Sequence, residues 1–145
     1  MTHQTAITWL KISSISLVVL GALFSWGTVD PLANITLSLI DFIIFPMDGA
    51  QSFAATETRL LTAISGGLTS GFAMAIYLTT VHVYASDQLA GGRIILGTTF
   101  TWFVVDGIGS ILAGVTLNVF ANLTFIIMIA LPVIMANHSA KTSTV

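Results

Sequence analysis

One carboxylate lies inside an apolar segment, where placing a charged group in lipid has a high free-energy cost. Asp106 falls near the middle of the hydrophobic stretch 94–117, and a charged side chain there costs about 2.5–3.5 kcal/mol to insert into lipid. At helical spacing it shares a face with Trp102 and Ser110, so we expect this face to point into a helix bundle. Asp106 and Ser110 are therefore a candidate ion or proton site. The alternative is a structural carboxyl that hydrogen-bonds a neighbouring helix.

Asp41 is a second candidate, on a shorter segment. Polar side chains recur there at helical spacing, at Asn34, Ser38 and Asp41. Asp30 followed by Pro31 is typical of a helix start, which predicts a helix over 31–45. At about 21 Å this helix is too short to span a bilayer, so we expect it to be interfacial or re-entrant. Asp41 then either lines an aqueous vestibule beside Asp106 or faces water at the membrane surface.

A ridge of small residues marks the next apolar segment. Its members follow one another at intervals of four, at Ala63, Gly67, Gly71 and Ala75. In lipid, such a ridge lets another helix approach closely and pack by van der Waals contact. We expect packing inside the chain's own bundle, with a subunit interface as the alternative.

His82 is a weak candidate for contact with a ligand, because no second histidine follows at metal-ligand spacing. The chain has no cysteine, which excludes thiolate metal sites and thiol catalysis. It carries no basic run for nucleic acid and no nucleophile or phosphate-loop motif. The sequence therefore gives no sign of an enzyme, a metal or nucleic-acid binding, and it does not specify a cofactor.

The elements that position these residues follow from composition. Of 145 residues, 55% are hydrophobic and 7% are charged, whereas a soluble domain has about 25% charged residues. Four segments reach the roughly 20 residues that a span requires, over approximately 7–26, 60–84, 94–117 and 119–136. We predict an all-α, integral membrane bundle of about four transmembrane helices plus the short helix 31–45, forming a single domain over 1–145. The turn between the last two spans is the least marked in the sequence.

The few basic residues predict an orientation. With four spans, Lys11, Arg93 and Lys141 fall on one side of the membrane and Arg59 falls on the other. Because basic residues concentrate on the cytoplasmic side, we expect both termini in the cytoplasm and the chain in a plasma or inner membrane.

Two functions fit these observations. The first is an accessory or structural subunit packed into a larger membrane complex, which explains the small extramembrane portion. The second is a small, homo-oligomeric ion- or proton-coupled channel or transporter that uses the midplane carboxylate Asp106. Both predict lipid contact together with protein partners, either other subunits or further copies of the chain.

Overall fold

The computed structural model describes residues 1–142 and the side chains through residue 139, so the part of the orientation argument that uses Lys141 lies outside the described side chains. Within this part of the chain, all regular structure is helical, and four helices are long and apolar enough to cross a membrane. The predicted bundle of four spans with a short helix is confirmed. The elements are α1 (His3–Trp26), α2 (Ala33–Ile44), α3 (Thr56–Thr79), the π-helical turn η1 (Thr80–Tyr84), α4 (Gln88–Leu112) and α5 (Leu117–Thr142).

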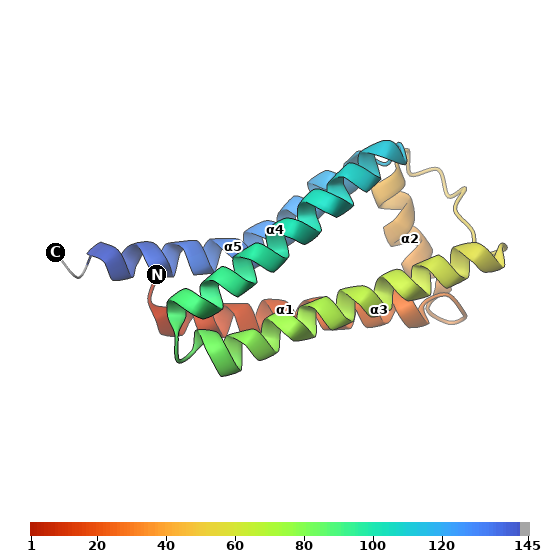
Figure 1. Ribbon diagram of the computed structural model, residues 1–145. Coiled ribbons are helices and arrows are strands. Elements are labelled where there is room, and N and C mark those ends of the chain that lie inside the picture. Colours follow the sequence, from red (N-terminus) through yellow and green to blue (C-terminus); the bar gives the residue numbers. More distant parts are fainter. Residues whose placement is uncertain (143–145) are drawn as a thin grey trace.

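The long helices form two pairs, α1 with α3 and α4 with α5, and the pairs diverge like the sides of a wedge (Figure 1). At one end, which holds the N-terminus and the connection from η1 to α4, the two pairs meet. We call this the closed end. At the opposite end, the open end, the pairs separate and α2 lies across the gap (Figure 1). Helices α3 and α4 make few contacts with each other although they are neighbours in sequence.

Glycines bring the backbones of α1 and α3 into direct contact. A Cβ atom added to Gly21 or Gly66 would lie less than 3.0 Å from backbone atoms of the partner helix. Beside them, the Ser70 hydroxyl donates a hydrogen bond to the carbonyl oxygen of Val18 at 3.1 Å. Close backbone approach of this kind stabilises helix pairs in lipid, where apolar side chains gain little by leaving the hydrocarbon.

The small-residue ridge predicted on α3 lies on a different face. Gly67 and Gly71 are exposed, and a Cβ at either position would meet no atom of the described residues within 4 Å. Ala75 is also exposed and Ala63 is half-buried. The expectation that this ridge packs inside the chain's own bundle is wrong, because α1 packs on the adjacent face of α3, which also carries small residues. The subunit-interface alternative stays a prediction.

The turn from α4 to α5 comes earlier than predicted. Helix α4 ends at Leu112, and Gly114 follows with a φ of +77°. The Val115 N–H donates to the Ser110 carbonyl at 2.8 Å and the Gly114 N–H donates to the Ile111 carbonyl at 3.0 Å, which is the Schellman pattern of a helix C-terminus. Asp106 therefore lies less than two turns from the end of α4, and not near the middle of the span.

The short helix α2 is anchored on the end of α1. Its 12 residues cover about 18 Å, so it does not span the bilayer. It begins at Ala33, two residues later than expected, after a turn in which the N–H groups of Leu32 and Ala33 donate to the Val29 carbonyl. Buried Thr36 donates to the Leu23 carbonyl of α1 at 3.4 Å.

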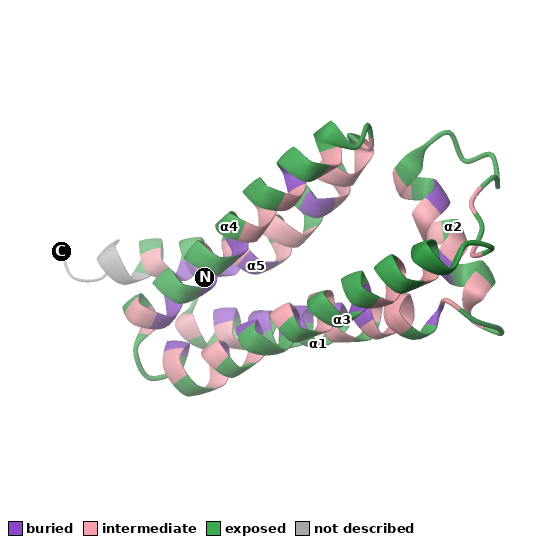
Figure 2. Cartoon of the chain, turned by 45° about the vertical axis from the view of Figure 1, so that its right-hand side comes forward, coloured by how far each residue is buried: buried purple, intermediate pink, exposed green. Residues whose placement is uncertain are grey.

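Buried residues lie mainly where the helices of the two pairs pack against each other. Figure 2 shows buried residues along the faces where helices meet, and exposed residues on the outer faces and around the loop after α2. Many of the exposed side chains are large and apolar, such as Leu68, Leu112 and Phe120. In a multi-pass membrane protein these outer faces contact the lipid bilayer.

Candidate functional site

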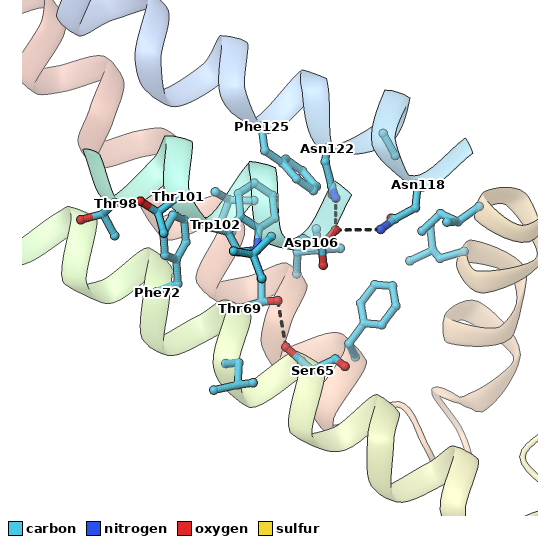
Figure 3. A pocket seen from close by; sticks show the side chains of 18 of the residues that line it. Ser65, Thr69, Phe72, Thr98, Thr101, Trp102, Asp106, Asn118, Asn122 and Phe125 are labelled. Atoms are coloured by element: carbon cyan, nitrogen blue, oxygen red, sulfur yellow. Dashed lines mark hydrogen bonds between the residues drawn. The ribbon is translucent and has the colours of Figure 1, made fainter. Parts of the chain in front are cut away.

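A cavity of about 1160 Å³ lies between the two helix pairs, toward the open end (Figure 3). It exceeds the roughly 300–1,000 Å³ of ordinary small-molecule pockets. All five α-helices contribute to its walls, including α2 through Leu39, Phe42 and Ile43. The space is therefore bounded at one end by the convergence of the pairs and at the other by α2.

The walls are mostly apolar and aromatic. Trp102 of α4 stands between Phe72 of α3 and Phe125 of α5, with ring centroids 5.5 Å and 6.3 Å apart respectively. Leu17, Leu20 and Phe24 of α1 line the space as well. These rings form an apolar wall of the cavity beside Asp106 (Figure 3).

One wall carries a cluster of hydrogen-bonding groups around Asp106. The side-chain amides of Asn118 and Asn122 on α5 both donate to Asp106 Oδ2, the former at 3.0 Å. Ser110 donates to the same oxygen at 3.4 Å and accepts from Asn118 at 2.8 Å. The Asp106 cluster, defined as Asp106, Ser110, Asn118 and Asn122, thus joins α4 to α5 with side-chain hydrogen bonds.

The early turn after Leu112 is what creates this cluster. Because α5 begins at Leu117, its first turns run back beside the last turns of α4. Asn118 and Asn122 are four residues apart, so both amides lie on the same face of α5. Both reach the carboxylate across the interface (Figure 3).

The second carboxylate oxygen has a different environment. Among the described residues, none donates a hydrogen bond to Asp106 Oδ1. This atom is also not among the buried side-chain atoms that lack a partner, and Asp106 lines the cavity. Asp106 therefore presents one satisfied oxygen to α5 and one open acceptor to the cavity.

Hydroxyl groups line the side of the cavity between α3 and α4. They belong to Ser65 and Thr69 of α3 and to Thr98 and Thr101 of α4. The Thr69 hydroxyl donates to the backbone carbonyl of Ser65 at 2.8 Å, so its hydrogen-bond donor is already used within α3. These groups add weak polarity to a surface that remains dominated by hydrocarbon.

Asp41 does not join Asp106. It is 9% exposed, its Oδ2 accepts from the backbone N–H of Gly49 at 3.2 Å, and its Oδ1 is buried without a partner among the described residues. It is absent from the cavity lining. Asp41 therefore neither lines the cavity with Asp106 nor is exposed on the surface of the chain, because the loop after α2 folds back over this carboxylate.

His82 lies in η1 at the closed end, where it is exposed and away from the cavity. Within the described part of the chain, no three histidine or acidic side chains come together in a way that could hold a metal ion. Arg59 is also remote from Asp106, since its guanidinium donates to the Phe53 carbonyl and to Thr56 beside the start of α3.

Sequence analysis missed the two asparagines that complete the site. Asn118 and Asn122 stand at the start of an apolar segment, where single polar residues commonly mark a turn. The available signal was their spacing of four residues next to a span with an intramembrane carboxylate. Comparison with protein-family models, curated proteins and solved structures finds no match to this chain.

Proposed function

We propose that the protein holds a membrane-soluble amphiphile in the cavity between its two helix pairs. The observation that carries this proposal is a volume of about 1160 Å³ with mostly apolar walls and a single carboxylate cluster on one side. Ligand sites have this composition in general: a hydrophobic surface supplies affinity, and a few polar groups fix the orientation. A bilayer delivers such a ligand directly to the opening.

The shape of the cavity favours an amphiphile over a helix of another protein. A spanning helix is about 30 Å long, whereas the cavity covers only Gly97 to Asp106 of α4, about 14 Å at 1.5 Å per residue. Its path along the bundle axis would also collide with α2, whose Leu39 and Phe42 line the cavity. A flexible chain with a small polar head fits without moving either pair.

Native mass spectrometry of the protein, extracted from its own membrane in mild detergent, tests the proposal. We expect a retained adduct of lipid-like mass. The variant Gly97→Leu places a side chain in the cavity and should abolish the adduct, because Gly97 lines the cavity and a Cβ there would meet nothing within 4 Å.

Gly109→Leu is the matched control. Gly109 lies on the same helix and is equally open, but it does not line the cavity. This variant should keep the adduct. A protein that emerges without any adduct, or an adduct that survives Gly97→Leu as well as it survives Gly109→Leu, contradicts the proposal.

An accessory role in a larger membrane complex is a second candidate, and the outer face of α3 favours it. Gly67 and Gly71 are exposed there with nothing within 4 Å of a Cβ, so the chain leaves the ridge free for a partner helix. The double variant Gly67→Ile/Gly71→Ile should fold normally and lose stoichiometric partner chains on extraction. Retention of the same partners by this variant would rule out the ridge as the interface.

The channel or transporter hypothesis receives less support from the geometry. Asp106 is the one ionisable side chain among the described residues that line the cavity, and most of the remaining lining is hydrocarbon. A hydrated ion is poorly stabilised by such walls. Flux through a homo-oligomer that depends on Asp106 stays a prediction from the sequence.

A further inference from the structure

The polar side of the cavity has a defined hydrogen-bonding character. Asp106 Oδ2 receives donors from Ser110, Asn118 and Asn122, whereas Oδ1 receives none from the described residues and is open to the cavity. A carboxylate is an acceptor in its ionised form and can take a bond from an ammonium or another N–H group. The vacant position at Oδ1 therefore calls for a donor from the ligand.

The charges around this oxygen point to the same conclusion. The described cavity lining contains no lysine, arginine or histidine, and Arg59 is engaged beside the start of α3. The two asparagine amides supply dipoles but no positive charge. A cationic head on the ligand would supply both the missing donor and the missing counter-charge, whereas an anionic head would meet a like charge in a medium of low dielectric.

Resting on the proposed function, we infer that the amphiphile is a long-chain amine, with its ammonium group at Asp106 Oδ1 and its hydrocarbon chain along Trp102 and Phe72. The cavity runs along α4 from Gly97 to Asp106, about 14 Å at 1.5 Å per residue. This is enough for a chain of dodecyl length. The head then lies less than two turns from the end of α4, and the chain extends toward the narrow part of the wedge.

The side between α3 and α4 gives the ligand a route from the bilayer. These helices make few contacts with each other. Leu68 of α3 is 70% exposed and Val105 of α4 is 68% exposed, and both line the cavity. The ligand enters laterally past these side chains, with its chain in hydrocarbon throughout.

Fluorescence of Trp102 tests this inference. The other two tryptophans, Trp9 and Trp26, are replaced by phenylalanine, and the protein is placed in nanodiscs of zwitterionic lipid. Dodecylamine, dodecanol and dodecanoate, each brominated on the chain as a quencher, are compared at equal mole fraction in the bilayer. We expect the amine to quench Trp102 at a concentration at least about tenfold lower than the alcohol, as one charge-assisted hydrogen bond implies, and the carboxylate to be weakest.

Asp106→Asn supplies the decisive comparison, with Asp48→Asn in the loop outside the cavity as its matched control. The first variant should bind amine and alcohol equally, and the second should keep the preference for the amine. Equal quenching by all three compounds in the unmodified protein overturns the inference but leaves the proposed function standing. Absence of saturable quenching by any of them refutes the proposed function itself. The series on the unmodified protein decides the matter even if Asp106→Asn does not fold.

Discussion

The closed end and the open end of the wedge are built from the same helices but packed in different ways. At the closed end, Leu10 of α1, Tyr84 of η1, Ile95 of α4 and Val133 of α5 are fully buried. At the open end, each helix pair continues alone, and the faces that the pairs turn toward each other line a cavity. The closed end therefore carries the stability of the bundle, and the open end leaves room for a ligand.

This difference in packing between the two ends explains how a bundle of four spans can enclose a cavity. Small residues let η1 and α4 touch at the closed end, where Gly91 and Gly92 are buried against Tyr84. Bulky rings at the narrow part of the wedge, above all Trp102 between Phe72 and Phe125, keep the pairs apart beyond that point. The opening is a consequence of side-chain volume along the helices.

The largest expected difference in stability between the two ends comes from adding one methyl group to a glycine of α4. In Gly91→Ala, the new Cβ would lie less than 3.0 Å from the Tyr84 backbone, and we expect a loss of about 3 kcal/mol in the free energy of unfolding. In Gly97→Ala, the Cβ meets nothing within 4 Å, and stability should stay constant or rise by up to about 1 kcal/mol. Unfolding in mixed micelles, followed by loss of helical signal, measures both. Equal destabilisation by the two variants would mean that the ends are packed alike.

A smaller effect tests whether the α1–α3 pair stays intact alongside the cavity. Gly66→Ala puts a Cβ against the backbone of α1, so we expect a loss of about 2 kcal/mol, since two separate helices can shift apart more easily than adjacent turns. Gly67→Ala, one residue further along α3, should cost nothing. The same unfolding measurement applies. A greater loss of unfolding free energy for Gly67→Ala than for Gly66→Ala would show that α1 packs on the Gly67 face of α3 and not on the Gly66 face.

The smallest expected effect concerns a polar atom in the closed end. Tyr84 is fully buried, and its hydroxyl has no hydrogen-bond partner among the described residues. Tyr84→Phe removes an unsatisfied group and keeps the ring, so we expect stabilisation of up to about 1 kcal/mol. The ring should also keep its edge contact with His3, at 4.9 Å between centroids. A clear loss of stability in this variant would show that the hydroxyl is bonded.

Much of the fold could be predicted from the sequence, because hydrophobic length is a direct requirement of the bilayer. The four spans and the short α2 follow from counting apolar residues. The turn after Leu112 was misplaced because Gly114 alone ends α4, and a single glycine inside an apolar run is also common within a membrane helix.

The candidate site could be predicted only in part. Asp106 is conspicuous because a carboxylate inside an apolar run is costly. Its partners Asn118 and Asn122 depend on the register between α4 and α5, which the misplaced turn concealed. The packing face of α3 could not be chosen either, because Gly66 with Ser70 and Gly67 with Gly71 have the same spacing on adjacent faces. Only the position of α1 distinguishes them.

The central claim is that the cavity at the open end binds a ligand. Spin labels at two adjacent residues of α4 test it most directly. Thr101 lines the cavity, whereas Phe100 is 66% exposed and does not. The chain has no cysteine, so a spin label can be attached to a single cysteine in Phe100→Cys or Thr101→Cys and its accessibility to oxygen measured in nanodiscs. Dodecylamine should lower the oxygen accessibility at position 101 several-fold and leave position 100 unchanged. An equal change in oxygen accessibility at both positions, or no change at either, would contradict the claim that a ligand binds in the cavity between the helix pairs.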